Sequence, residues 1–164
     1  MQSLNLDIFH AFHAGWALVT AGTANNFNTM TVSWGGLGTL WSKSVATVYI
    51  RPSRHTDSYL EQNEIFTVSF FPEQYRQDLT FLGTVSGRDG DKIAKTGLTP
   101  VSLGGGVGFA QASCTLVCKK LYRQTLDADQ IPADVMQSFY GSEPVHKMYI
   151  GEVLEVITAP ESAG

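Results

Sequence analysis

Six segments rich in β-branched and aromatic residues dominate this sequence and limit the folds that it can adopt. Each is short, and glycine, proline, asparagine or serine residues separate it from the next, which is typical of β-strands. The helices expected between them are few and short, whereas a doubly wound parallel sheet needs a crossover helix after nearly every strand. The pattern therefore predicts a mainly β fold, a closed antiparallel barrel with helices in one or two connections. The expected strands are residues 16–21, 28–33, 45–50, 65–71, 112–121 and 146–156, and the expected helices are residues 57–62, 73–84 and 132–140, with a helical turn at 91–95.

Two local features are expected to begin or interrupt these elements. Thr56 directly precedes the helix expected at 57–62 and is of a residue type that caps helix N-termini. The glycine-rich run Gly-Gly-Gly-Val-Gly at 104–108 is expected to form a flexible loop.

Length and charge narrow the class of protein. At 164 residues the chain is expected to form one domain, residues 1–164, with its own core. Its 11 Lys and Arg against 15 Asp and Glu give a net charge of −4, which argues against a nucleic-acid-binding surface or a polybasic membrane anchor. No apolar run approaches the roughly 20 residues of a membrane-spanning helix, and the N-terminus lacks the basic segment of a secretory signal. We therefore expect a cytoplasmic protein that binds neither nucleic acid nor membrane.

The two cysteines are expected to be reduced packing residues. Cys114 and Cys118 are four positions apart on an expected strand, hence roughly 13 Å apart at ~3.3 Å per residue, whereas a disulfide needs Cα atoms within about 7 Å. No histidine or third cysteine lies near them, and His10 and His13 have no carboxylate or cysteine at ligand spacing. No metal site is therefore expected.

Two segments combine cations with hydroxyl groups in a way that suits a phosphate group. In Arg-Pro-Ser-Arg-His-Thr at 51–56, two arginines flank a proline beside two hydroxyl residues, and in Ser-Gly-Arg-Asp-Gly-Asp-Lys at 86–92 a lysine follows a serine–glycine pair. Arginine binds phosphate oxygens in a bidentate manner, lysine adds a point charge, and hydroxyl and backbone N–H groups bind the remaining oxygens. In an acidic chain such clustering favours one bound phosphate group, while a solvated loop is the alternative for each segment alone.

Common nucleotide-binding motifs are absent. The run at 104–106 is followed by Phe109 where a dinucleotide fingerprint needs a third glycine, and the run at 36–38 fails in the same way at Trp41. The segment at 87–92 has the wrong spacing for a Walker loop. These mismatches argue against nucleoside triphosphates and against cofactors bound to a Rossmann fold.

The strand expected at 28–33 continues into Trp34 and a glycine pair. It mixes hydroxyl groups, an amide and an indole, and the glycines allow the backbone to approach a ligand. Such a strand can bind a flat ring system with polar edges through its backbone groups, with Trp34 as apolar cover. An ordinary strand with a core tryptophan is the alternative.

Four motifs, taken in order, resemble those of the flavin reductase-like family of FMN-binding split barrels, to which flavoredoxins belong. They are Asn-Thr-Met-Thr-x-Ser-Trp-Gly from position 28, Arg-Pro-x-Arg-x-Thr from 51, Ser-Gly-Arg-Asp-x-Asp-Lys from 86 and His-x-x-Tyr-Ile-Gly-Glu-Val from 146. The resemblance spans roughly residues 16–156. It implies a six-stranded antiparallel split barrel with a few short helices, a homodimer, and non-covalent FMN near the dimer interface.

The resemblance also implies roles for individual residues. The ligands of the phosphate would be Arg51, Ser53, Arg54, Thr56, Ser86, Gly87 and Lys92. The residues lining the isoalloxazine would be Asn28, Thr29, Met30, Thr31, Ser33 and Trp34.

The redox chemistry of such a protein belongs to the flavin, which the protein binds, orients and tunes. No side chain is assigned as catalytic from the sequence. His146 is the candidate for the substrate side of the flavin because an imidazole can donate to a carboxamide or ring edge, and a structural histidine at the barrel rim is the alternative.

Three functions are compatible with these motifs. The first is an NAD(P)H-dependent flavin reductase that passes electrons to a small-molecule or protein acceptor. The second is an FMN electron carrier of the flavoredoxin type, fed by another redox protein. The third is a non-enzymatic flavin-binding protein, which the complete set of motifs disfavours. The sequence does not separate the first two.

Overall fold

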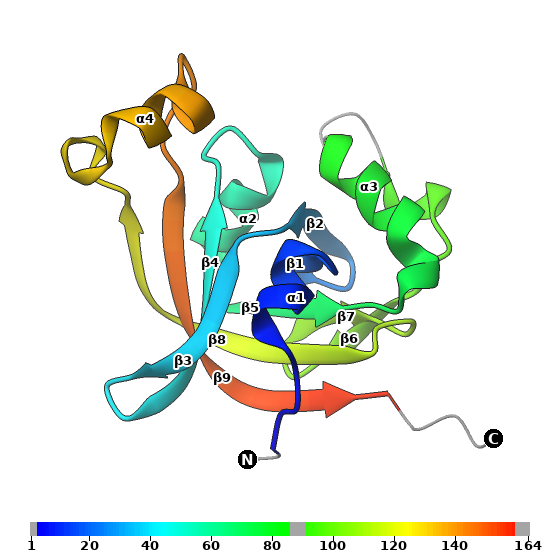
Figure 1. Cartoon of the computed structure of the whole chain (residues 1–164). Coiled ribbons are helices and arrows are strands. Elements are labelled where there is room, and N and C mark those ends of the chain that lie inside the picture. The colour runs from blue at the N-terminus through cyan, green and yellow to red at the C-terminus, as the bar shows by residue number, and fades with distance from the viewer. Residues whose placement is uncertain (1–2, 86–90, 160–164) are drawn as a thin grey trace.

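A strongly curled antiparallel sheet forms the body of the protein, and short helices surround it (Figure 1). The computed structural model describes residues 3–85 and 91–159. Within these residues seven strands form one sheet in the order β2-β1-β5-β8-β9-β4-β3, with every neighbouring pair antiparallel, and two more form the hairpin β6-β7. The strands are β1 (Ala17–Thr23), β2 (Asn26–Val32), β3 (Gly35–Leu40), β4 (Lys43–Ile50), β5 (Ile65–Phe70), β6 (Pro100–Leu103), β7 (Gly106–Phe109), β8 (Cys114–Thr125) and β9 (Lys147–Thr158).

The mainly β antiparallel fold expected from the sequence is confirmed, although the strand count differs. The described residues contain nine strands rather than six. The glycine-rich segments at 35–40 and 106–109 form β3 and β7, and Pro100–Leu103 forms β6, which pairs with β7. Glycine has low strand propensity, so the sequence pattern hid β3 and β7. At Gly106 the missing side chain is required, because a Cβ atom would lie 2.9 Å from Cγ2 of Ile65.

Helices occupy the connections between strands. The segment expected as one helix at 73–84 is a 3₁₀ turn followed by an α-helix, and the segment at 132–140 is a short α-helix followed by a π-helical turn. The N-terminal helix α1 was not expected from the sequence; its N-cap is Asp7, whose carboxylate accepts from the backbone N–H of His10. The helices are α1 (Ile8–His13), α2 (His55–Gln62), η1 (Glu73–Tyr75), α3 (Arg76–Thr84), η3 (Ile93–Lys95), η4 (Ala128–Gln130), α4 (Ala133–Val135) and η5 (Met136–Tyr140).

The cap assigned to the helix at 57–62 was wrong. Helix α2 begins at His55, its N-cap is Arg54, and Thr56 lies inside the first turn. The Thr56 side chain is buried, and its hydroxyl donates to Oδ1 of Asn28 on β2 at 2.8 Å. A tertiary hydrogen bond therefore uses the hydroxyl that the sequence pattern assigned to a local cap.

Strand β1 is buried on both faces, which sets the layers of the fold. Val19 packs in the main core with residues of β5, β8 and β9, whereas Leu18, on the opposite face, packs against Leu79 and Leu82 of α3. Strands β8 and β9 are long, and their register shifts between Val117 and Cys118, where a bulge bends the sheet. Helix α3 thus covers the outer face beside β2 while the sheet curls around the main core (Figure 1).

A polar cluster joins α2 to β9. The Lys147 ammonium donates to Asp57 at 2.8 Å and to Glu61 at 2.7 Å, and the Tyr149 hydroxyl lies 2.6 Å from Asp57 and 2.7 Å from Glu61. These four side chains form what we call the α2–β9 polar cluster. Because α2 directly follows the 51–54 segment, the cluster holds the start of that helix against the sheet.

Two further expectations concern the cysteines and the membrane. Cys114 and Cys118 are both buried and form no disulfide, as expected. Within the described ranges, no helix is long and apolar enough to cross a membrane.

Candidate functional site

Strand β2 lies at one edge of the seven-stranded sheet, and its polar side chains tie it to three neighbours. The Thr29 hydroxyl lies 2.8 Å from the Thr20 hydroxyl on β1, Asn28 accepts from Thr56 on α2, and the Thr31 hydroxyl donates to the Leu79 carbonyl on α3. In the described part of the sheet β2 pairs only with β1, so its other backbone edge is not used by a strand. A fixed strand with a free edge can offer backbone N–H and C=O groups to a ligand.

One end of β2 borders a cavity of about 170 Å³, which we call the Trp34 cavity. It collects side chains from β2, the end of β4, the loop before α2 and the loop before β9. Its lining residues are Met30, Thr31, Val32, Ser33, Trp34, Tyr49, Arg51, Arg54 and His146.

The pairing of β4 with β9 places Arg51 beside His146. These strands are antiparallel with Ile50 opposite Lys147, so the residue after Ile50 and the residue before Lys147 are neighbours. Both residues also line the Trp34 cavity. A single long-range strand pairing therefore assembles this part of the site.

Arg51 has one satisfied and one unsatisfied guanidinium nitrogen. Nη2 donates to the Phe139 carbonyl at 3.0 Å, whereas Nη1 is buried and has no hydrogen-bond partner among the described residues. A buried polar group without a partner costs about 1–3 kcal/mol, and more when it is charged. Arg51 also lines the Trp34 cavity, so a ligand acceptor that entered between its guanidinium and the protein could satisfy this nitrogen.

Trp34 is the aromatic wall of the cavity. Its side chain is 39% exposed, its ring stands edge to face with Phe139 at 5.3 Å between centroids, and it is tilted to His146 at 5.1 Å. An indole that remains this accessible at the mouth of a cavity can cover a flat ligand.

His146 is buried, and its Nδ1 atom lies 2.9 Å from the hydroxyl of Tyr140. Burial lowers the pKa of the imidazole to about 4, and the nearby positive charge of Arg51 contributes to that shift. At neutral pH His146 is therefore uncharged.

Arg54 and Lys92 converge on the C-terminal end of α3. Arg54 donates to the Gly83 carbonyl and Lys92 to the Val85 carbonyl, each at 3.0 Å. A helix C-terminus attracts cations, but carbonyl groups do not neutralise them. Within the described residues neither side chain forms a salt bridge with a carboxylate.

The electrostatic state of these two cations suits a bound anion. Lys92 is only 5% exposed, and its burial lowers the pKa of the ammonium to about 8, with the positive charge of Arg54 contributing. Burial also lowers the pKa of Arg54. A bound anion would stabilise both charged forms, so the donor set fits a phosphate group.

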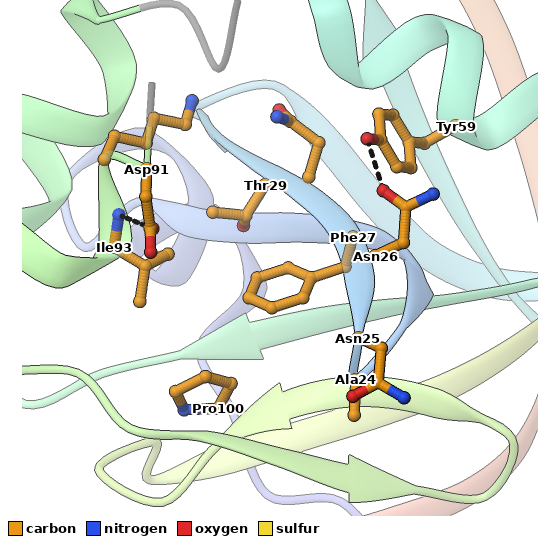
Figure 2. Close-up of a pocket in the computed structure, with 11 residues that line it drawn as sticks. Ala24, Asn25, Asn26, Phe27, Thr29, Tyr59, Asp91, Ile93 and Pro100 are labelled. Atoms are coloured by element: carbon orange, nitrogen blue, oxygen red, sulfur yellow. Dashed lines mark hydrogen bonds between the residues drawn. The ribbon is translucent and has the colours of Figure 1, made fainter.

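The other end of β2 borders a larger cavity of about 460 Å³, which we call the Lys92 cavity (Figure 2). Its walls come from the β1–β2 hairpin, α2, the segment before η3 and the start of β6. Asn26 accepts from the Tyr59 hydroxyl at 2.7 Å, and Asp91 accepts from the backbone N–H of Ile93 at 3.1 Å (Figure 2). The lining residues are Ala24, Asn25, Asn26, Phe27, Asn28, Thr29, Tyr59, Asp91, Lys92, Ile93 and Pro100.

The structure brings most of the residues predicted from the sequence to these two cavities at the two ends of β2. Ser53 is exposed and lines neither of them, and Thr56 is buried behind Asn28. Ser86 and Gly87 lie outside the described residues. The Trp34 cavity contains Met30, Thr31, Ser33, Trp34, Arg51, Arg54 and His146, and the Lys92 cavity contains Asn28, Thr29 and Lys92.

Sequence reasoning missed three aromatic residues of the site. Tyr49 precedes Arg51 by two positions at the end of β4, and both line the Trp34 cavity, so the alternation of side chains along that strand could have indicated it. Phe139 and Tyr140 end η5 as an aromatic pair before Gly141, but only the fold places them beside Trp34 and His146.

A family model described as flavin reductase like domain matches residues 9–164. A search of curated proteins returned no match.

Solved structures share the fold. An FMN-binding protein from Thermus thermophilus, solved with bound 1-cyclohex-2-enone, is 21% identical with a TM-score of 0.71, covering 96% of this chain and 78% of that chain. Flavoredoxin from Methanosarcina acetivorans is 17% identical with a TM-score of 0.70, covering 100% and 78%. The styrene monooxygenase flavin reductase from Pseudomonas putida S12 is 18% identical with a TM-score of 0.67, covering 90% and 80%.

Proposed function

This chain belongs to the flavin reductase-like domain family, and we propose that it binds FMN non-covalently and acts as an FMN-dependent oxidoreductase. In this proposal residues 1–164 form a single FMN-binding domain, NAD(P)H supplies the electrons, and a small molecule or a protein accepts them. Bound FMN would supply the hydride and electron chemistry.

The phosphate group of FMN is assigned to the cations at the end of α3 and to the segments beside them. The observation that carries the proposal is the pair Arg54 and Lys92. Both cations donate to the Leu82 carbonyl, and within the described residues neither pairs with a carboxylate. The proposed phosphate ligands are Arg51, Ser53, Arg54, Thr56, Ser86, Gly87 and Lys92.

Strand β2 and Trp34 are assigned to the isoalloxazine. Hydrogen bonds to β1, α2 and α3 hold β2 in place, so its free backbone edge is preorganised for the polar edge of the ring. Trp34 covers the apolar part and excludes water. The proposed ring-binding residues are Asn28, Thr29, Met30, Thr31, Ser33 and Trp34.

A second copy of the chain is proposed to complete the site. The Trp34 cavity, at about 170 Å³, is smaller than the roughly 300–1,000 Å³ of small-molecule sites. Trp34 and Phe139 remain partly exposed at its mouth, and aromatic side chains of this kind are enriched in interfaces. We therefore propose a homodimer with FMN near the interface, located in the cytoplasm.

A flavoredoxin-type electron carrier is the second candidate function. The similarity to the Methanosarcina acetivorans flavoredoxin favours it, because no motif for nicotinamide distinguishes this chain from a carrier. In that case another redox protein, rather than NAD(P)H, would reduce the bound FMN.

Two measurements test the proposal. Titration of flavin-free protein should show tighter binding of FMN than of riboflavin, because riboflavin lacks the phosphate that the cations would bind; equal affinities would remove the phosphate assignment. Stopped-flow mixing of FMN-loaded protein with NADH or NADPH should then bleach the flavin absorbance rapidly, and an absence of bleaching would favour the carrier.

A further inference from the structure

We propose that Tyr140 is a positioning residue that holds His146 as the neutral tautomer with its proton on Nε2, so that this N–H group donates to an oxygen acceptor in the Trp34 cavity. The tautomer follows from the protein alone. The identity of the acceptor, a carbonyl, carboxamide or carboxylate oxygen of a substrate bound beside the flavin, rests on the proposed function.

The two side chains form a buried pair built by one short loop. Tyr140 is 5% exposed and His146 is 6% exposed, and the Tyr140 hydroxyl lies 2.9 Å from Nδ1. Tyr140 is the last residue of η5, and Gly141, with φ of 39°, turns the chain so that it returns to His146 just before β9. The backbone carbonyl of His146 accepts from Leu126 at 3.0 Å, which fixes the residue at this position.

The hydrogen-bonding capacity of the pair determines which nitrogen of His146 carries the proton. The Tyr140 hydroxyl carries one proton, and within the described chain His146 Nδ1 is its only hydrogen-bond partner. If Nδ1 carried a proton, the buried phenol proton would have no acceptor, which costs about 1–3 kcal/mol. The phenol therefore donates to Nδ1, and a neutral imidazole that accepts at Nδ1 carries its proton on Nε2.

The surroundings keep the imidazole neutral. Arg51 contributes a positive charge on one side, and Trp34, Tyr49 and Tyr140 contribute rings without charge. The lining of the Trp34 cavity includes Arg54 as a second cation and no carboxylate among its described residues. No group there favours an imidazolium ion, in agreement with the pKa of about 4 for His146.

The Nε2 atom is the part of the ring that a ligand can reach. It lies across the ring from Nδ1, has no hydrogen-bond partner in the described structure, and is not among the fully buried unpaired atoms. His146 lines the Trp34 cavity, and the proposal therefore assigns this atom to the cavity wall. A neutral N–H donor beside Trp34 orients an oxygen acceptor without transferring a proton to it.

The tautomer is tested in flavin-free protein by long-range proton–nitrogen NMR of ¹⁵N-labelled histidine. The resonances of His146 are identified by their loss in His146→Gln. The wild type should show a single neutral tautomer with the proton on Nε2, and Tyr140→Phe should show a mixture of both tautomers. Tyr122→Phe, which removes a hydroxyl that bonds to Gln124 rather than to His146, is the matched control and should leave the spectrum unchanged.

Either of two results overturns the positioning role: a wild-type proton on Nδ1, or an unchanged His146 spectrum in Tyr140→Phe. The wild-type spectrum decides the tautomer even if Tyr140→Phe does not fold. To test the donor role, nicotinamide is added to FMN-loaded protein, and the Nε2 proton resonance should shift; a resonance that does not move overturns that role. A chain that fails to bind FMN would contradict the proposed function, while the tautomer result would still stand.

Discussion

Arg54 and Lys92 donate to the same oxygen atom, the carbonyl oxygen of Leu82 near the end of α3, at 3.5 Å and 3.3 Å. Two cations that share one neutral acceptor repel each other, and the charge of Arg54 contributes to the lowered pKa of Lys92. The apo protein therefore holds an unfavourable arrangement of charge that an anion would relieve.

Removing either cation should weaken FMN binding. A charge-assisted hydrogen bond to a ligand is worth about 1.5–3 kcal/mol, so Arg54→Ala and Lys92→Ala should each raise the dissociation constant roughly 10- to 100-fold. Flavin titration by fluorescence measures this directly. Arg123→Ala is the control, because Arg123 lies on β8 outside both cavities and pairs with Glu61. Unchanged affinity in both site variants would show that these cations do not bind the phosphate.

The burial of Lys92 should make the stability of the flavin-free protein depend on pH. Its pKa is lowered from 10.5 to about 8 in the folded protein, so between these values the unfolded chain binds more protons at this group. The contribution of Lys92 to the free energy of unfolding therefore rises as the pH increases from about 8 to 10.5. Urea unfolding at about pH 8 and about pH 10 should show a larger gain for the wild type than for Lys92→Met. Equal gains would mean that folding does not lower the pKa of Lys92.

Trp34 should quench the fluorescence of bound FMN. An indole at the cavity wall is a nearby electron donor for a flavin bound there, so Trp34→Leu should brighten the bound flavin. Trp41→Leu is the control, since Trp41 is 61% exposed in the turn between β3 and β4 and lines neither cavity. Equal changes in both variants would place Trp34 away from the ring.

The α2–β9 polar cluster should stabilise the fold at neutral pH and lose this effect in acid. Burial raises the pKa of Glu61, but hydrogen bonds from Lys147 and Tyr149 outweigh it, and the pKa is lowered from 4.5. A lowered folded-state pKa means stability that is present above the unfolded value and lost as the pH falls through the folded value.

Glu61→Gln should therefore lower the unfolding free energy at about pH 7 and flatten its decline toward about pH 3, as measured by urea unfolding. Glu155→Gln, an exposed change on β9, is the control. If Glu61→Gln kept the acid dependence of the wild type, Glu61 would not be the group that titrates.

The protein should be a dimer that loosens when flavin is removed. A second copy would cover Trp34 and Phe139 and enlarge the small Trp34 cavity. Sedimentation with FMN bound should give about twice the chain mass of 17.9 kDa at micromolar concentration. A mass near that of one chain under these conditions would contradict the homodimer.

The sequence predicted the fold class well and the element boundaries less well. Periodicity identified six strands correctly because β-branched residues and turn residues act over a few neighbouring positions. It missed three strands. The glycines of β3 and β7 have weak strand propensity, and pairing with β4 and β6 holds them in strands; the four-residue β6 was missed with its partner β7. It also misplaced the start of α2, since the Thr56 hydroxyl is used by Asn28 across the fold.

The sequence by itself determined the chemical inventory of the site: two cationic segments, a polar strand and a following tryptophan. Only the tertiary structure decided which of these residues meet. The pairing of Ile50 with Lys147 brings Arg51 to His146, and the loop after η5 brings Tyr140 to the same imidazole. Local sequence patterns do not reveal which residues become neighbours in this way. Strand register and the path of a loop depend on contacts between segments far apart in the chain.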